Sequence, residues 1–535
     1  MSEPTRSTDH RLPQLGHSFA NALPEMATPW QAAEFPEPRL EILNEELAGE
    51  LGLDVQWLRT PEGLQFLTGQ LLPAGAVPVA QGYAGHQFGQ LSPRLGDGRA
   101  LLLGELTTPD GRTVDLHLKG SGRTPWARGG DGLAPLDAAL KEYLYAEAVH
   151  GLGIPTSRCL AVISTGQQVM RETVVPGGLV VRVADSHLRV GSFQYAALHD
   201  LSGDKTPATP VLPRLMDYTI ARHFPDIDPT AGSGKDRALA LFQAVMDRQA
   251  ELVALWMRAG FIHGVLNTDN VALSGQTIDF GPCAFMDKAD PATVFSQIDT
   301  QGRYAFGNQP AIIGWDLARF AECLIPIVGS AEPLQELLGT FGERYSAAYT
   351  DAMSQALGIS RLDAPTRREL VDAFWREVVA AGADYPATLR ALAELAAHGD
   401  TIPAAGTAPT AVHRSLAGEL PTTDGFTAWL KRWRAATPDA QEALGHTPRW
   451  SARNRPVRDA IRQAARSGGA PAGEDTTHGD PEGIEKINLL VQALRHPFGA
   501  DPTQALSPAA AALADQHLLL PDPGDASPFY TVCGT

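Results

Sequence analysis

The stretch HGVLNTDN at residues 263–270, followed by TIDFG at residues 277–281, decides the fold that we predict. Asn270 ends the first motif, and Asp279 stands in the middle of the second. An amide oxygen and a carboxylate are hard oxygen ligands of the kind that magnesium prefers beside phosphates. We therefore expect Asn270 and Asp279 to hold Mg²⁺ or Mn²⁺ against a nucleotide. The alternative is that Asn270 only caps a turn and Asp279 only ends a strand.

The order and spacing of these two motifs are typical of protein kinases, whose catalytic loop reads H-R-D-L-x-x-x-N and is followed by D-F-G. The sequence therefore predicts an α+β, protein-kinase-like fold with a β-rich N-lobe, a helical C-lobe and a helical C-terminal extension. Val265 stands where a kinase keeps its catalytic Asp, and valine cannot take a proton. Asp269 offers a displaced carboxylate, which we expect to act as the base for a differently placed substrate.

Residues upstream of these motifs supply the rest of a nucleotide site. In DLHLKG (115–120) the alternation of polar and apolar residues places Lys119 opposite the apolar face, as for a strand lysine that points into a phosphate cleft. Its expected partner is Glu142, on a helix predicted from about Leu136 to Leu152. The alternative for Lys119 is a solvated position at the edge of a strand.

Two glycine-rich turns are further candidates for phosphate contacts. Gly96 and Gly98 would let the backbone approach a phosphate closely, and Arg99 would add positive charge. The second turn contributes Asp131 and Gly132. An ordinary hairpin turn or surface loop is the alternative for both segments.

Two arginines lie between the predicted lobes. Arg182 and Arg189 occur in RVADSHLRVG (182–191), and a fork of guanidinium donors there can clamp terminal phosphates. Surface arginines without a ligand are the alternative.

The chain has 535 residues, which exceeds one average domain and predicts two or three packed units. A long amphipathic helix is expected at residues 238–260, and Gly, Pro, Ala and Thr-rich loops at 399–412 and 467–483. The predicted division is an N-terminal extension (1–75), the kinase-like N-lobe (76–205), the helical C-lobe (206–395) and a helical C-terminal region (396–535).

Composition narrows the classes of partner. The formal net charge of −18 argues against a nucleic-acid or anionic membrane surface as the main partner, because both attract basic patches. Four cysteines without a C-x-x-C pair indicate neither a disulfide scaffold nor a zinc site. The first ten residues do not resemble a secretory signal, and no apolar run is long enough to span a membrane. We therefore expect a cytoplasmic protein. No sequence feature decides the oligomeric state, for which a monomer is our expectation.

An ordered set of longer stretches resembles the selenoprotein O family of protein adenylyltransferases over most of the chain. The stretches that carry this resemblance are YAGHQFGQLSPRLGDGRALLLGE (83–105), LKGSGRTPWARGGDG (118–132), LGIPTSR (152–158), RVADSHLRVGSF (182–193), HGVLNTDN (263–270), IDFGP (278–282) and GRYAFGNQP (302–310).

The resemblance implies a kinase fold that holds ATP in a flipped orientation, so that AMP passes to a Ser, Thr or Tyr hydroxyl of a protein substrate and pyrophosphate leaves. Redox-related proteins are among the substrates it suggests. It implies that Asp269 is the proton acceptor, that Asn270 and Asp279 are the metal ligands, and that Glu142 positions Lys119. The residues that it places around ATP are Gly96, Gly98, Arg99, Lys119, Asp131, Gly132, Arg182, Arg189 and Asp279.

The sequence departs from the family pattern at a few positions. Leu133 replaces an arginine that often follows the second glycine-rich turn, and Phe280 replaces a common tyrosine. Like members of the family, the chain has a cysteine near its terminus, Cys533. Whether Cys533 forms a regulatory disulfide stays open, because no partner cysteine is obvious. Two other functions also stay open: a metal-dependent phosphotransferase, against which Val265 counts, and a catalytically silent pseudokinase that binds ATP as a scaffold.

Overall fold

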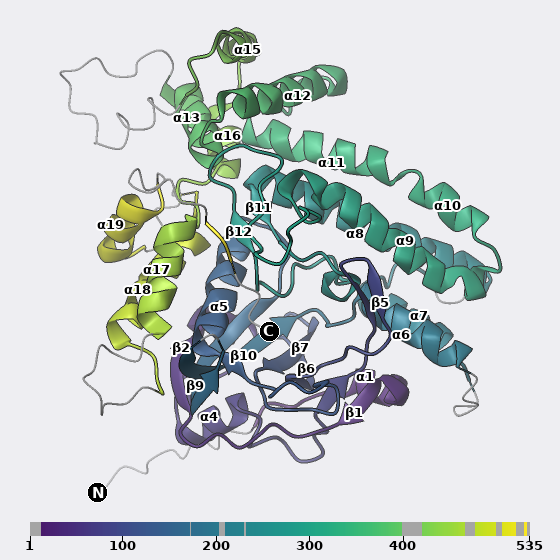
Figure 1. Ribbon diagram of the computed structural model, residues 1–535. Helices are drawn as coiled ribbons and strands as arrows, with labels where there is room; N and C mark the ends of the chain where they lie inside the picture. Colours follow the sequence, from purple (N-terminus) through teal and green to yellow (C-terminus); the bar gives the residue numbers. More distant parts are fainter. Residues whose placement is uncertain are drawn as a thin grey trace, which may run out of the picture.

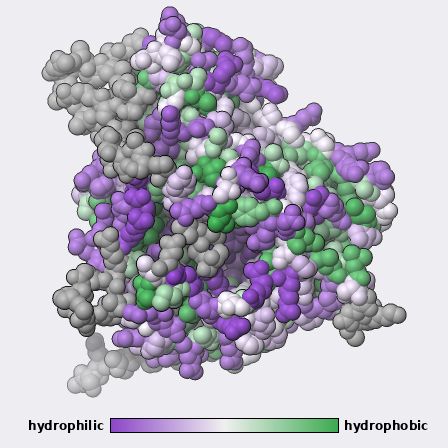
Figure 2. Space-filling view, in the orientation of Figure 1, coloured by the Kyte–Doolittle hydropathy of each residue, from purple (hydrophilic) through white to green (hydrophobic). Residues whose placement is uncertain are grey.

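The computed structural model describes residues 12–171, 173–202, 209–228, 232–398, 420–465, 477–498, 506–519 and 529–531 of the chain. It shows an α+β protein with one large antiparallel sheet and many helices. Hydrophilic side chains cover much of the face drawn in Figure 2, in keeping with the acidic net charge. No helix in the described part of the chain is long and apolar enough to cross a membrane.

The strands form one large sheet and two small two-stranded sheets. Their bounds are β1 (Ala27–Pro29), β2 (Arg39–Leu43), β3 (Val79–Gln81), β4 (Gly85–Gln87), β5 (Gln90–Ser92), β6 (Ala100–Thr107), β7 (Thr113–Lys119), β8 (Ala134–Pro135), β9 (Arg158–Met170), β10 (Val174–Ala184), β11 (Phe261–Ile262) and β12 (Ala284–Phe285). The large sheet has the order β1-β3-β6-β7-β10-β9-β2, with β8 paired to β10. The small pairs are β4 with β5 and β11 with β12.

Helices make up most of the chain after β10. The helices are α1 (Ser18–Ala22), α2 (Glu45–Glu50), α3 (Val55–Leu58), α4 (Pro61–Leu67), α5 (Leu136–Gly151), α6 (Val190–Leu201), α7 (Val211–His223), α8 (Gly234–Ala259), α9 (Gln309–Val328), α10 (Glu332–Leu338), α11 (Phe341–Ala356), α12 (Ala364–Ala381), α13 (Tyr385–His398), α15 (Asp424–Ala435), α16 (Ala440–His446), α17 (Asn454–Ala465), α18 (Pro481–Arg495) and α19 (Pro508–His517). In Figure 1 the sheet lies at the bottom, α8 to α11 lie above it, and α17 to α19 lie beside α5.

The two faces of the sheet belong to two hydrophobic cores. Leu116, Leu118 and Val181 belong to the core that also contains residues of α2, α3 and α4. Val162 and Val180 belong to the larger core, which α5 and the later helices share. Because side chains alternate along a strand, Lys119 shares a face with Val180 and not with Leu118. The predicted orientation of Lys119 is therefore confirmed.

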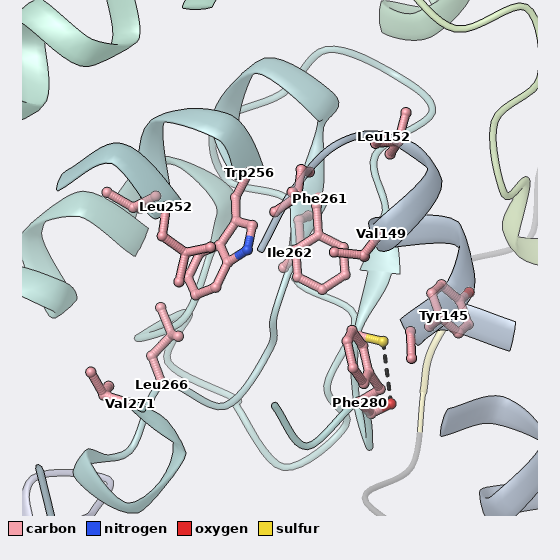
Figure 3. Packing of buried hydrophobic residues seen from close by; sticks show 14 of the residues in the cluster. Tyr145, Val149, Leu152, Leu252, Trp256, Phe261, Ile262, Leu266, Val271 and Phe280 are labelled. Atoms are coloured by element: carbon pink, nitrogen blue, oxygen red, sulfur yellow. Dashed lines mark hydrogen bonds between the residues drawn. The ribbon is translucent and has the colours of Figure 1, made fainter. Parts of the chain in front are cut away.

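The larger core also fixes the segments that carry the two deciding motifs. Figure 3 shows Tyr145 of α5 and Trp256 of α8 on either side of Phe261, with Phe280 below. Phe280 is 1% exposed, and its carbonyl accepts a hydrogen bond from Cys283 Sγ at 3.2 Å. Burial of such large side chains holds the backbone next to Asp279 in place.

Helix α5 joins the sheet to the C-terminal helices. Glu147 is fully buried, and its carboxylate accepts hydrogen bonds from Arg158 at 2.7 and 2.8 Å. Arg495, at the end of α18, donates to the same carboxylate at 2.7 Å. Gly151 lies so close to α18 that a Cβ there would be 2.0 Å from the Leu494 carbonyl oxygen. The C-terminal region is therefore packed directly on α5.

The predicted elements agree with the structure at most positions. The helix expected from Leu136 to Leu152 is α5, and the helix expected at 238–260 is α8, which ends at Gly260 with a φ of 70°. The loop expected at 399–412 lies outside the described residues, as does most of the loop at 467–483. The second loop ends earlier than expected, because α18 begins at Pro481 with Asp480 as its N-cap.

Candidate active site

A group of ion pairs brings β7, α5 and the second motif together. Lys119 Nζ lies 2.6 Å from Glu142 Oε2 and 2.8 Å from Asp279 Oδ1. The sequence predicts the contact between Lys119 and Glu142, and the structure contains it. Glu142 is only 4% exposed and comes from the middle of α5, so packing of that helix sets its position.

Two arginines complete the same group. Arg182 lies on β10, and its guanidinium contacts both Glu142 and Asp279, the latter at 2.7 Å. Arg189 lies 3.5 Å from Asp279 Oδ2 and donates to the Asp269 backbone carbonyl at 2.8 Å. Arg189 also stacks on the Tyr83 ring at 4.5 Å. We call these five residues, Lys119, Glu142, Arg182, Arg189 and Asp279, the cationic cluster.

The cationic cluster keeps both of its carboxylates ionised. Burial alone would raise the pKa of Asp279, but Lys119, Arg182 and Arg189 outweigh it and hold that pKa well below the ordinary range. Burial likewise opposes ionisation of Glu142, and Arg182 with Lys119 lowers its pKa.

Asp279 has a backbone φ of +63°, a conformation that non-glycine residues seldom adopt. Such strain often occurs where a side chain must be aimed at a ligand.

The carboxylate of Asp269 has a different environment. Gln87 Nε2, on the β4–β5 hairpin, donates to both of its oxygens at 2.9 Å. Burial raises the pKa of Asp269 to about 6, although Arg189 and Gln87 lower it. Gly85 is required here, because a Cβ at that position would lie 2.5 Å from Asp269 Oδ1.

The loop before Asp269 is tied to the second motif and to helix α9. His263 is fully buried, and its Nε2 donates to the Ile278 carbonyl at 2.8 Å. The His263 backbone amide donates to Gln309 Oε1 at 2.9 Å. These bonds fix the loop that carries Asp269 relative to the segment that carries Asp279.

The residues present suit the expected metal in their chemistry. Asn270 Nδ2 donates to the Val265 carbonyl at 2.9 Å, which leaves Asn270 Oδ1 as an oxygen ligand. Asp279 adds an ionised carboxylate, so both donors are of the hard type that Mg²⁺ and Mn²⁺ take together with phosphate and water. Within the described ranges, no group of three or more His, Cys, Asp or Glu side chains is arranged to hold a metal by itself.

The glycine-rich turns lie at the Lys119 end of the sheet. Arg99 directly precedes Ala100, which pairs with Lys119, and the Arg99 carbonyl accepts from the Gly120 amide at 2.7 Å. Gly96 has a φ of +80°, and a Cβ there would lie 2.4 Å from the Trp126 ring. Only glycine fits this position.

Asp131 lies in the second turn. Its carboxylate pairs with Arg171 at 2.7 Å, and it accepts from the Leu133 amide at 2.9 Å. Arg99 donates to the Leu133 carbonyl at 3.4 Å, so Arg99, Asp131 and the adjacent Gly132 lie in one region. The structure thus brings the five predicted turn residues to one end of the sheet, beside the cationic cluster.

No sequence pattern points to Gln87 or Tyr83 as residues of the site. Both lie in the stretch 83–105 that carries the family resemblance, but a glutamine on a short hairpin has no pattern that points to a base elsewhere in the chain. Their places depend on how the hairpin folds onto residues 267–269, where His86 N donates to Thr268 Oγ1 at 2.7 Å.

Known proteins resemble this chain over most of its length. The family described as "Protein adenylyltransferase SelO" matches residues 13–463. A "Protein nucleotidyltransferase YdiU" of Mycobacterium sp. (strain KMS) is 48% identical over 526 residues, which cover 97% of this chain and 99% of the relative. A protein of the same name from Mycolicibacterium paratuberculosis is 47% identical over 97% of this chain and 98% of the relative. The chain therefore belongs to the SelO/YdiU family of protein nucleotidyltransferases.

Proposed function

We propose that this protein is a protein adenylyltransferase, which moves AMP from ATP to a Ser, Thr or Tyr hydroxyl of a protein substrate. The proposal includes a kinase-like two-lobed architecture, Mg²⁺ or Mn²⁺ as the metal, and a monomer that acts in the cytoplasm. The transfer of AMP is supported by the family's name and by relatives named protein nucleotidyltransferases.

The observation that carries the proposal is the contrast between two carboxylates. Asp279 contacts Lys119, Arg182 and Arg189, whereas the carboxylate of Asp269 is bonded by the neutral amide of Gln87. A carboxylate that neighbouring cations keep ionised has the charge state that a metal ligand needs, and one without a cation on its oxygens suits a proton acceptor. Val265, where a kinase keeps its base, is 7% exposed and apolar.

In the proposed reaction the acceptor hydroxyl oxygen attacks the α-phosphorus and its proton passes to an oxygen of Asp269. The bond from the α-phosphorus to the bridging oxygen breaks, and pyrophosphate leaves with the electron pair. Lys119, Arg182 and Arg189 stabilise the charge that develops on the leaving group. A bound metal ion, held by Asn270 and Asp279, would neutralise further phosphate charge. Glu142 keeps Lys119 and Arg182 in place and does not itself react.

The test is transfer from labelled ATP to protein. The full-length protein is incubated with α-labelled or γ-labelled ATP and magnesium or manganese, with and without cell lysate. Label on protein only from the α position supports AMP transfer, and Asp269→Asn should abolish it. Asp351→Asn, an exposed carboxylate on α11 that pairs with Arg367, is the matched control and should transfer normally.

Other outcomes point to the rival functions. Label only from the γ position would make the protein a phosphotransferase and overturn the proposal. If neither label is transferred although ATP binds, the protein is a silent nucleotide-binding scaffold.

A further inference from the structure

The proposed chemistry uses no residue of the C-terminal helices, yet α17 reaches the segment that carries Asp279. The short sheet of β11 and β12 joins the two deciding motifs, because His263 directly follows β11 and β12 begins five residues after Asp279. Phe261 pairs with Phe285 across this sheet. A shift of β12 would therefore move the second motif relative to the first.

Asn454, the first residue of α17, occupies the outer edge of β12. Its Nδ2 donates to the Phe285 carbonyl at 2.6 Å, and its Oδ1 accepts from the Phe285 amide at 3.1 Å. An antiparallel pair of strands leaves the outer edge of each strand open to a further partner. The buried Asn454 side chain takes this place on β12, as a third strand would. In Figure 1, β12 lies between β11 and α17.

The preceding residue, Arg453, holds the chain just beyond β12. Its guanidinium is buried and lies 2.8 Å from Asp287 and 2.8 Å from Asp384, which directly precedes α13. A second nitrogen of the guanidinium donates to Asp384 at 3.0 Å. The two carboxylates lie on segments that are themselves paired, since the Tyr385 amide donates to the Asp287 carbonyl at 2.7 Å. Arg453 is thus the cation that both carboxylates share.

The turn from Asp279 to β12 is short and well packed. The Phe280 carbonyl accepts a hydrogen bond from Cys283 Sγ across this turn. The rings of Phe280 and Phe285 both pack edge-on against Phe261. The position of β12 is therefore passed on to the backbone of Asp279.

We propose that Asn454 and Arg453 are positioning residues for Asp279, so that α17 belongs to the support of the active site. This rests on the proposed function, in which Asp279 is a metal ligand. A non-glycine residue with a φ of +63° keeps that conformation only where the surrounding structure holds it. Asn454 and Arg453 hold the segment into which Asp279 leads.

The arginine contacts have a counterpart in protein kinases. Kinase activation loops, which follow D-F-G, become ordered when phosphorylation creates new pairs with arginine. Arg453 makes its pairs with carboxylates that are always present. The segment after Asp279 is therefore ordered without modification.

Binding of nucleotide and metal tests the proposal without turnover. The affinity of the full-length protein for a non-hydrolysable ATP analogue is measured by titration calorimetry at several magnesium concentrations. Asn454→Ala should raise the dissociation constant about tenfold at low magnesium, the lower end of the effects of outer-shell changes at metal sites. Excess magnesium should restore the affinity. A loss of folded protein would instead lower the stoichiometry, which magnesium does not restore.

Hydrogen–deuterium exchange of the free protein reports on the segment directly. In the wild type the amides of residues 284–287 should exchange slowly, because Asn454 and Arg453 hold this stretch. Asn454→Ala should speed exchange across residues 279–287 and leave β6 and β7 unchanged. Equal exchange in the variant and the wild type would overturn the proposal.

Further variants separate positioning from general stability. Arg453→Met should weaken binding as much as Asn454→Ala, and Arg453→Lys should keep part of the affinity. Arg449→Met is the matched control, because Arg449 lies four residues earlier and pairs with Asp515 of α19 at 3.0 Å. It should lower thermal stability without changing the affinity. If thermal unfolding shows that Arg453→Met does not fold, Asn454→Ala decides the question.

The outcomes distinguish the positioning role from the reaction. Wild-type affinity in Asn454→Ala at low magnesium, or an equal loss in Arg449→Met, would overturn the positioning role. Transfer from α-labelled ATP by the wild type is measured separately. If Asn454→Ala weakens binding but the wild type transfers no AMP, the proposed function fails and the positioning role stands.

Discussion

The two carboxylates of the candidate site lie ten residues apart in sequence but in opposite electrostatic surroundings. Asp279 lies among Lys119, Arg182 and Arg189, and its pKa is held well below the ordinary range. Asp269 lies under the neutral Gln87 amide, and burial raises its pKa to about 6. The same side chain is therefore kept as a permanent anion in one place and is able to exchange a proton in the other.

In the proposed function, this contrast separates ligand binding from proton transfer. The β-strands and α5 supply the cations around Asp279, whereas a short hairpin supplies the cover over Asp269. Substitutions at Asp279 and the cations around it should therefore affect ATP binding. Substitutions at Asp269 and on the β4–β5 hairpin should affect the rate of AMP transfer.

The largest expected effect is the loss of ATP affinity on substitution of Asp279. Asp279→Asn removes the anion that the three cations share and one of the two metal ligands. We expect the dissociation constant for ATP with magnesium, measured by titration calorimetry, to rise by more than about 100-fold, because even outer-shell changes at metal sites cost 10–100-fold. An unchanged dissociation constant would show that Asp279 holds no metal. Asp351→Asn serves again as the control.

On the hairpin side, Asp269→Asn should leave ATP binding within about twofold and lower the rate of transfer by about 10²–10⁴-fold, the usual range for removal of a general base. Single-turnover transfer and ATP affinity are measured on the same preparation. If the transfer rate and the ATP affinity fall together, Asp269 and Asp279 do not have the separate roles that we propose.

The pH dependence of transfer should follow Asp269 and not Asp279. A base works when it is deprotonated, so the rate should rise about tenfold per pH unit below the Asp269 pKa of about 6 and level off above it. Asp279 stays ionised throughout this range and contributes no step. A profile that is flat between pH 5 and 8, or one that Asp269→Asn does not alter, would argue against this base.

A smaller change sharpens the same comparison. Gln87→Ala removes the donor that favours the ionised form of Asp269, so the Asp269 pKa should rise and the midpoint of the pH–rate profile should move to higher pH. Gln87→Glu should move it further, because a second carboxylate is added. A midpoint that stays in place in both variants would mean that the Gln87 contact does not persist in solution.

The smallest effect is expected at Asp131, which lies outside the cationic cluster. Its side chain is 47% exposed and pairs with Arg171, and such pairs contribute about 0.2–1 kcal/mol. Asp131→Ala should therefore change the free energy of unfolding by less than about 1 kcal/mol, and ATP affinity by a few-fold at most. An affinity loss as large as that of Asp279→Asn would show that the second turn contacts the nucleotide directly.

The sequence predicted the parts of the site that depend on local pattern. The alternation of residues along a strand predicted the face on which Lys119 lies. The helical periodicity and the glycines that end the helix predicted the position of α5 and hence of Glu142. The motif spacing brought Asn270 and Asp279 into one loop region. Regular elements of known direction leave few ways to place such residues.

The remaining contacts could not be read in this way because they join distant irregular segments. Gln87 meets Asp269 across 182 residues, and Arg171 meets Asp131 across 40. No periodicity links such pairs, and their meeting depends on how two loops fold onto each other.

The salt bridge between Glu147 and Arg495 bears on how the protein is synthesised. The two residues are separated by 348 positions, so the ribosome completes α5 long before it makes α18. Domains fold largely from the N-terminus as the chain emerges. During that interval Glu147 has only Arg158 as its cation, and α5 lacks the helices that pack on it. Helix α5 should therefore reach its final packing only after α18 has been made.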